Sequence, residues 1–368
     1  MKITGIELVR LCLPLSPPFP AAWDPEPRRG FPATVVLVDT DEGVRGVGSG
    51  DSMDGFEGYA GLFTGTDPLA LARQVRVLET VAFHGCRPWP LEAALWDIAG
   101  QVTGQPVARL LGGFTDRVPA YASTGTLATP SARVEMALSA AELGFRAMKI
   151  RVDPARLTEG LAAVAAVREA LPDFTLMVDL NQGWRMPGDT RPPLDRAAAR
   201  AIAVRLAEFG VYWMEEPLCG TDASGLAALR RDCPVRVAGG EMARGYAELA
   251  TLAEADALDV YQPDAVLAAG ISRARTLAEH VLVKGRMFSP HTWTNGIGLL
   301  ANLHLTAGVG GGPYLEYPFD PPGWTPARRD FMLAEPVTIT SEGDLAVPDR
   351  PGLGAILDED ALRRYRVS

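Results

Sequence analysis

The chain has 368 residues, of which 47% are hydrophobic and 22% are charged, and its formal net charge is −10 at neutral pH. These values predict a globular protein long enough for two domains, and no apolar run reaches the length that a membrane span needs. The acidic balance, without a basic stripe or tail, disfavours a nucleic-acid partner.

The cysteines and the N-terminus bear on the cellular compartment. The opening MKITGIELVR lacks the apolar stretch of a signal peptide. The four cysteines are far apart and show no paired spacing; they are Cys12, Cys86, Cys219 and Cys233. We therefore expect a protein of the reducing cytoplasm.

The first 51 residues predict a small antiparallel sheet. Residues 3–14, 33–39 and 44–51 are strand-like, and the turn TDEG joins the second and third of them into a hairpin. Residues 16–30 form a loop rich in proline and charge, which is too long for a simple connector. We expect this loop to be a lid.

Helical sequence follows the sheet. In residues 91–104 the apolar side chains recur at intervals of three and four, and the helix is expected to end at its glycine. We place the first domain boundary near Asp116, which predicts an α+β domain over residues 1–116.

From residue 118 onward, strands and helices alternate. The strand-like runs are 118–124, 145–152, 174–180, 211–215, 235–240, 257–262, 285–290 and 313–317. Eight such units predict an α/β fold, a modified TIM (β/α)-barrel over residues 117–330. The tail, 331–368, loses this rhythm and is expected to return to the first domain and complete it.

Three acids close three successive strand-like runs of the predicted barrel: Asp179, Glu215 and Glu241. Parallel strands place their carboxyl ends on one face of a barrel, so these side chains are expected to converge. Three hard oxygen ligands suit Mg²⁺ or Mn²⁺. Any one of these acids could instead cap a helix, but three in register favour a shared cation site.

A histidine and an aspartate end two neighbouring strands. His291 directly follows the seventh run and Asp264 lies just past the sixth, so the two side chains are expected to meet. An aspartate on one ring nitrogen fixes the tautomer and raises the basicity of the other nitrogen, which predicts a general base. The remaining histidines have no carboxylate partner at matching depth and are expected to be structural; they are His84, His280 and His304.

Several short motifs occur in a fixed order: LWDIAGQVTGQPVARLLGG, KIR, DLNQGW, WMEEP, GGE, QPD followed by AAGIS, PHTW and LEY. Together they resemble the enolase superfamily, in its mandelate racemase/muconate lactonizing enzyme-like branch, over essentially the whole chain. The resemblance implies an α+β capping domain over the barrel, with Mg²⁺ bound by the three acids. It also implies removal of the proton α to a carboxylate, through an enediolate whose charge the metal stabilises.

Two further residues take roles by match to the family. Lys149, as the first lysine of a KxK motif, should add positive charge beside the substrate carboxylate; the alternative is a lysine whose stem packs at a strand end. Glu316 matches the acid of the eighth strand. In its protonated form it would hydrogen-bond the intermediate, a role that needs a raised pKa.

The chain departs from the family pattern at Arg151, where two-base members have a second lysine. Arginine stays protonated, so a mechanism that exchanges protons on both faces of the α-carbon loses one base. One histidine can still take the α-proton and then protonate a leaving β-hydroxyl, which is dehydration. The predicted substrate is a sugar acid, an aldonate or aldarate, which would give a 2-keto-3-deoxy acid. Arg151 would bind the leaving hydroxyl or a distal carboxylate.

Three other functions are weighed against dehydration. A racemase or epimerase of a 2-hydroxy or amino acid derivative would need a second proton donor. A barrel without catalysis would bind a metal and a carboxylate but form no product. A metal hydrolase is disfavoured because such sites usually recruit histidine ligands.

Substrate contacts are expected at the barrel mouth and in the loops above it; the candidates are Asn181, Trp184, Trp293, Asp24, Arg28, Arg29 and Asp51. Glu216, next to Glu215, would point the other way in an extended strand and support the site from behind. The resemblance also implies a small-molecule carboxylate as the partner, and a homo-oligomer.

Overall fold

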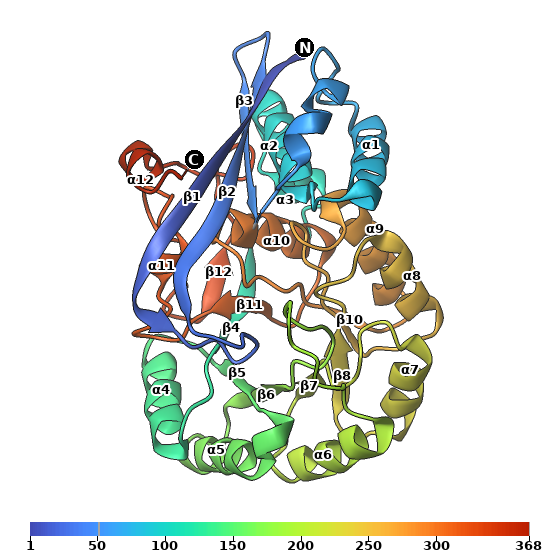
Figure 1. Cartoon of the computed structure of the whole chain (residues 1–368), viewed down its shortest axis with the longest axis vertical. Helices are drawn as coiled ribbons and strands as arrows, with labels where there is room; N and C mark the ends of the chain where they lie inside the picture. Colours follow the sequence, from blue (N-terminus) through green and yellow to red (C-terminus); the bar gives the residue numbers. More distant parts are fainter. Residues whose placement is uncertain (51, 368) are drawn as a thin grey trace.

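The computed structural model describes residues 1–50 and 52–367, so the candidate contact Asp51 lies outside the described residues. Figure 1 shows an N-terminal sheet with its own helices above a curled parallel sheet, which further helices surround. This arrangement confirms the predicted fold class. Within the described part of the chain, each helix is too short or too polar to span a bilayer.

The N-terminal sheet contains β1 (Ile3–Phe19), β2 (Arg28–Thr40) and β3 (Arg45–Gly50), paired antiparallel in that order. The predicted lid loop of residues 16–30 is too long, because pairing of β1 with β2 resumes at Phe19 and Arg28 after an irregularity. Proline is tolerated in β1 because this strand lies at the edge of the sheet. The connecting loop is therefore only residues 20–27.

Four helical segments pack beside this sheet: η1 (Phe56–Leu62), α1 (Leu71–His84), α2 (Trp89–Thr103) and α3 (Val107–Leu110). Helix α2 is the one that the sequence predicts, and it ends at Gly104 in a left-handed conformation, φ 64°. Gly48 lets β3 approach this helix closely, because a Cβ at that position would lie 2.0 Å from the Pro90 carbonyl oxygen.

The barrel strands follow the predicted order. They are β4 (Arg117–Ser123), β5 (Ala147–Arg151), β6 (Thr175–Asp179), β7 (Trp213–Glu215), β8 (Arg236–Gly239), β9 (Val260–Tyr261), β10 (Met287–Phe288) and β11 (Leu315–Pro318). They pair in parallel in the order β10-β9-β8-β7-β6-β5-β4-β11. Between β10 and β11 a single bridge, Phe288 with Gly312, replaces a ladder. Each strand therefore delivers its carboxyl end to one mouth.

Helices between and after these strands cover the outside of the barrel (Figure 1). They are α4 (Pro130–Glu142), η2 (Pro154–Arg156), α5 (Leu157–Ala170), α6 (Arg196–Glu208), α7 (Ala223–Asp232), α8 (Tyr246–Glu254), α9 (Gly270–Leu282), α10 (Gly296–Val309) and α11 (Pro326–Arg329). Their apolar faces lie against the sheet; α5, for example, buries Leu161, Val164 and Val167. The helices thus bury an apolar layer against the outer face of the sheet.

The C-terminal tail touches both parts of the molecule. Strand β12 (Asp344–Ala346) first pairs antiparallel with β4 of the barrel. After α12 (Glu359–Arg364) the chain then runs beside β1, where the Val367 amide donates to the Arg10 carbonyl at 2.9 Å. The tail therefore joins the N-terminal sheet only after adding a strand to the barrel.

His304 of α10 joins the barrel to the N-terminal part and to the tail. Its Nδ1 accepts from the Ala108 amide at 3.0 Å, and its Nε2 donates to the Leu353 carbonyl at 3.1 Å. The side chain is fully buried, and this burial lowers the pKa of His304 to about 4. A buried neutral imidazole is a structural group, as the sequence predicts.

We expect the thermal stability of the protein to fall as the pH drops from about 6.5 to about 4. The folded pKa of His304 lies below the unfolded value, so its contribution is present above the unfolded pKa and is lost on acidification. The loss by pH 4 is about 3 kcal/mol. Melting temperatures measured over this range should fall less steeply in His304→Gln, which keeps a donor and an acceptor but does not titrate. An equal slope in the two proteins would contradict the assignment.

Candidate active site

The three predicted acids converge at the barrel mouth. Asp179 ends β6 and Glu215 ends β7, opposite each other in register, while Glu241 follows β8. All three are buried, and one oxygen from each lies within 4.8 Å of the others. Such a cluster of buried carboxylates requires positive charge to be stable.

The oxygens of this cluster have unequal partners. Glu215 Oε2 accepts from Gln262 Nε2 at 2.7 Å and from Trp213 Nε1 at 3.2 Å. Glu241 Oε1 accepts from Trp184 Nε1 at 2.8 Å, but its Oε2 is buried without a hydrogen-bond partner. A buried anionic oxygen without a donor, facing two further carboxylates, fits a divalent cation of the Mg²⁺ type.

Lys149 lies at the bottom of the cluster and is fully buried. Its ammonium contacts Glu215, lies 2.7 Å from Glu316 Oε1, and lies 3.5 Å from Asp179 Oδ2. Burial alone would lower the pKa of Lys149, but these carboxylates raise it above its usual value. Lys149 is therefore a fixed positive charge.

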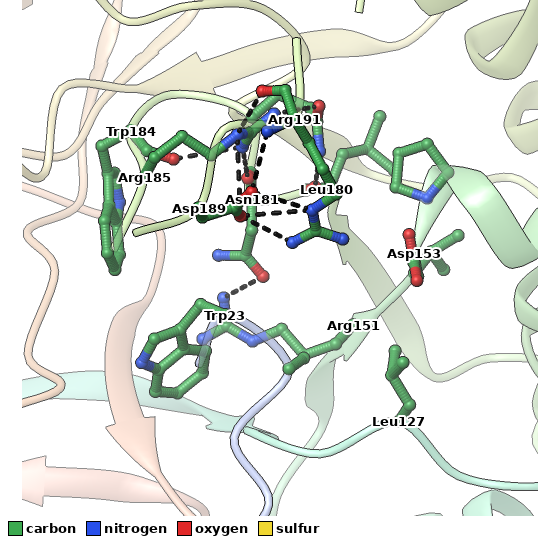
Figure 2. Close-up of a pocket in the computed structure, with 14 residues that line it drawn as sticks. Trp23, Leu127, Arg151, Asp153, Leu180, Asn181, Trp184, Arg185, Asp189 and Arg191 are labelled. Atoms are coloured by element: carbon green, nitrogen blue, oxygen red, sulfur yellow. Dashed lines mark hydrogen bonds and ion pairs between the residues drawn. The ribbon is translucent and has the colours of Figure 1, made fainter. Parts of the chain in front are cut away.

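Arg151 is the second cation of the site. It pairs with Asp179, and its Nε donates to the Thr124 carbonyl at 2.7 Å. Figure 2 shows its guanidinium below the Asn181 amide and beside Trp23; Nη1 lies 3.3 Å from Asn181 Oδ1. The guanidinium carbon lies 4.7 Å from the centroid of the Trp23 ring and 5.7 Å from that of Trp293. The acids outweigh burial and raise the pKa of Arg151, so it cannot act as a base.

His291 and Asp264 meet as the sequence predicts. His291 Nδ1 lies 2.9 Å from Asp264 Oδ2, and Asp264 Oδ1 accepts from the Val266 amide at 2.8 Å and from Asn302 at 3.1 Å. Because Asp264 accepts, Nδ1 carries a proton and Nε2 faces the mouth, 3.9 Å from Glu241 Oε2. Burial opposes the charged form, but Glu241, Glu316 and Asp264 raise the pKa of His291 to about 10.

The surroundings of Glu316 favour its ionised form and not the protonated form that the resemblance implies. Its two oxygens accept from Ser123 Oγ and from the Thr292 amide, each at 2.7 Å, and Lys149 lies beside it. Burial would raise the pKa of Glu316, but the Lys149 ammonium and His291 lower it to about 2. Glu316 is an ionised partner of Lys149.

Glu216 also departs from its expected position. The strand ends one residue earlier, and Glu216 takes a left-handed conformation, φ 47°, instead of continuing the extended chain. Its side chain is buried near Gly183, where a Cβ would lie 2.2 Å from Glu216 Oε1. Desolvation, followed by Glu241 and Asp179, raises the pKa of Glu216 well above its usual value. The structure thus adds a further buried carboxyl to the cluster.

A cavity of about 160 Å³ opens above these groups. Its polar lining is Arg28, Arg151, Asn181, Glu241 and His291, and its apolar lining is Trp23, Trp184, Met186, Met242, Leu267 and Trp293. Asp24 is outside this lining and pairs with Arg28, and Arg29 is exposed. Sequence reasoning missed Trp23, although a tryptophan inside a proline-rich loop was an available signal. No sequence signal pointed to the other three apolar lining residues, which are Met186, Met242 and Leu267.

A second hollow adjoins the cavity and shares Arg151, Asn181 and two tryptophans with it (Figure 2). Here Arg185 donates to the Asn181 carbonyl at 2.8 Å and to the Trp184 carbonyl at 3.1 Å. Arg191 pairs with Asp189 at 2.7 Å. These bonds hold the loop that carries Asn181 and Trp184 over the site.

Comparison with known proteins gives concordant results. The family described as "Enolase C-terminal domain-like" matches residues 132–361. D-galactarolactone cycloisomerase from Agrobacterium fabrum is 31% identical over 100% of this chain and 99% of its own length. L-talarate/galactarate dehydratase from Salmonella typhimurium is 33% identical over 74% of this chain and 64% of its own length. The crystal structure of that dehydratase liganded with Mg and L-lyxarohydroxamate has a TM-score of 0.83 and 27% identity, covering 100% of this chain and 93% of that chain.

Proposed function

This chain belongs to the enolase superfamily, and on that premise we propose that it removes the proton α to the carboxylate of an acid sugar and expels the β-oxygen. The observation that carries the proposal is the His291–Asp264 pair, whose free ring nitrogen faces the cavity above the three acids. A divalent cation held by Asp179, Glu215 and Glu241 would act as a Lewis acid, stabilising the charge that develops on the substrate carboxylate.

In this proposal His291 Nε2 takes the α-proton. Its Nδ1–H stays bonded to Asp264, which stabilises the imidazolium that forms. Lys149 keeps its proton throughout and adds positive charge beside the substrate carboxylate. The imidazolium can then give this proton to the leaving β-oxygen.

The arrangement favours elimination over the racemase or epimerase alternative. Inversion at the α-carbon needs a second group that exchanges a proton on the opposite face. The other two cations of the site are Lys149 and Arg151, and the surrounding carboxylates raise the pKa of each, so both stay protonated. Among the described residues lining the cavity, His291 is the one whose neutral form has a free ring nitrogen to take a proton, with Asp264 on the other nitrogen to stabilise the imidazolium.

The identity of the leaving group separates two possible reactions, a dehydration and a ring-opening isomerisation. If the β-oxygen is a free hydroxyl, the reaction is the dehydration that the sequence predicts, and the product is a 2-keto-3-deoxy acid. If the β-oxygen belongs to a ring, the reaction is a ring-opening isomerisation. The second candidate is favoured by the relative that matches the whole chain, which is a cycloisomerase.

The test is a screen of the purified protein with Mg²⁺ against aldonates, aldarates and their lactones. Semicarbazide would detect 2-keto acids, and proton NMR in D₂O would detect exchange at the α-carbon. We expect a 2-keto acid from at least one acid sugar, and no product after chelation of the metal. Exchange with inverted configuration and no keto acid would instead identify an epimerase.

A further inference from the structure

We infer that Asp320 is a positioning residue of the active site. It lies outside the lining of the cavity, and hydrogen bonds through residues 124–126 connect it to Arg151 on one side and to the 20–27 loop on the other. Its effect on turnover rests on the proposed function, with Arg151 as a substrate contact in the wall of the cavity.

The backbone around Asp320 is fixed just beyond β11. The Phe319 amide donates to the Ser123 carbonyl, at the end of β4, at 2.9 Å. Asp320 and Trp324 exchange both of their backbone hydrogen bonds, at 2.9 and 2.8 Å. Asp320 itself is buried. Its carboxylate is therefore held in place beside the segment that follows β4.

One oxygen of this carboxylate accepts three hydrogen bonds from that segment. Asp320 Oδ2 accepts from the Gly125 amide at 2.8 Å, from the Thr126 amide at 2.7 Å and from Thr126 Oγ1 at 2.8 Å. Hydrogen bonds to a carboxylate are about twice as strong as those between neutral groups. The Thr126 carbonyl accepts from Nη2 of the buried Arg133 at 2.6 Å. Charged side chains therefore hold Thr126 from both sides.

The carbonyls of the same segment serve the active site. The Thr124 carbonyl accepts from Arg151 Nε at 2.7 Å. The Gly125 carbonyl accepts from the Ala22 amide of the 20–27 loop at 2.8 Å. Ala22 precedes Trp23, and Figure 2 shows Trp23 beside Arg151, whose guanidinium carbon lies 4.7 Å from the centroid of the ring. These two carbonyls thus hold the guanidinium and the loop that carries the neighbouring ring.

Asp320 and the active site use opposite ends of the same two peptide units. A peptide unit is planar and trans, so its carbonyl points away from its N–H. In the unit that joins Thr124 to Gly125, the N–H donates to Asp320 and the carbonyl faces the guanidinium. In the unit that joins Gly125 to Thr126, the N–H donates to the same oxygen and the carbonyl accepts from the 20–27 loop. By holding both N–H groups, Asp320 sets the direction of both carbonyls.

The aromatic rings around Gly125 cannot replace these bonds. A Cβ at Gly125 would lie 2.5 Å from Trp293 and 2.7 Å from Phe19, so the segment lies tightly against both rings. Trp293 Nε1 donates elsewhere, to Ser123 Oγ at 2.8 Å. Packing limits how far the segment can move, whereas hydrogen bonds determine which way its peptide units face.

Replacing Asp320 with alanine should lower kcat/KM about 10²-fold on the substrate found in the screen, the size of loss that a misplaced positioning group can cause. The loss should come mainly through KM, because His291 keeps its bond to Asp264 while Arg151 is displaced. Asp320→Asn keeps an oxygen that can accept the same bonds and should restore most of the activity. Asp232→Ala, at the exposed end of α7, is the control and should change nothing.

A double-mutant cycle tests whether the effect passes through Arg151. Arg151→Lys keeps a positive charge beside Asp179 but loses the Nε that the Thr124 carbonyl holds. Adding Asp320→Ala to this variant should lower kcat/KM by a smaller factor than it does in the natural protein, because residues that act through one network are not additive. Equal factors in the two backgrounds would contradict a role through Arg151.

Hydrogen exchange tests the connection to the loop without a substrate. In Asp320→Ala, the peptide that contains Ala22 should exchange faster, because the carbonyl that accepts from this amide is no longer held. Peptides from β6 (Thr175–Asp179) should keep their rates, and Asp232→Ala should leave both regions unchanged. Thermal unfolding would verify that each variant folds.

The outcomes separate the two proposals. If Asp320→Ala leaves both KM and the exchange of the 20–27 loop unchanged, or speeds exchange equally in β6, then Asp320 is not a positioning residue, and the proposed elimination stands. If the natural protein forms no keto acid and exchanges no α-proton with any acid sugar, the proposed elimination falls. Faster exchange confined to the 20–27 loop and residues 124–126 would then still support Asp320 as the group that positions them.

Discussion

Replacing His291 with asparagine is expected to lower kcat by about 10²–10⁴-fold, because the α-proton then has no acceptor. His291 Nε2 is the ring nitrogen that faces the cavity, since Nδ1 is held by Asp264 at 2.9 Å. Steady-state kinetics on the substrate found in the screen would measure the loss. Because the base must be neutral to accept a proton, kcat/KM of the natural protein should rise with pH through the pKa of this group, and the variant should lose that limb.

The matched control is His280→Asn, which replaces an exposed histidine of α9. Its kcat should equal that of the natural protein. Asp264→Asn provides a second check, because it keeps the side chain's shape but removes the charge that stabilises the imidazolium. It should lower kcat without removing Mg²⁺ binding. Near-normal turnover by His291→Asn would refute the single-base assignment.

The parts of the site that the sequence predicts are those fixed by strand periodicity. Asp179, Glu215 and Asp264 end or closely follow parallel strands, so knowing the strands places their side chains at one mouth. The pairing of His291 with Asp264 follows from adjacent strand ends in the same way. Predicting the positions of these residues requires no knowledge of loop conformation, and the structure brings them together where expected.

The parts that sequence reasoning missed depend on backbone conformation and long-range charge. Glu216 leaves its strand in a left-handed turn, which a run of extended residues does not reveal. The protonation state of Glu316 depends on Lys149, which comes from another strand and lies 2.7 Å away. The connection between β1 and β2 is shorter than predicted because strand pairing resumes beyond the prolines of β1. These three features could not be predicted from the secondary-structure propensity of the neighbouring residues.

Mg²⁺ is expected to raise the melting temperature of the protein, because the site concentrates negative charge. Five carboxyl groups are buried at the mouth: Asp179, Glu215, Glu216, Glu241 and Glu316. Lys149 contacts Asp179, Glu215 and Glu316, Arg151 pairs with Asp179, and His291 Nε2 lies 3.9 Å from Glu241 Oε2. An ion that binds only the folded state at a hundredfold excess over its Kd stabilises that state by about 2.7 kcal/mol. Differential scanning fluorimetry across a Mg²⁺ titration, after treatment with a chelator, would measure the shift.

Glu241→Gln should abolish this shift without destabilising the metal-free protein. The glutamine Oε1 can still accept from Trp184, as Glu241 Oε1 does at 2.8 Å. The substitution removes one of several mutually repelling charges, so the metal-free variant should melt at or above the temperature of the metal-free natural protein. Glu279→Gln, at an exposed position of α9, makes the same chemical change away from the site and should keep the full response to Mg²⁺. A Mg²⁺ shift that survives in Glu241→Gln would place the cation elsewhere, and Lys149, Arg151 and protonation would then have to stabilise the acid cluster.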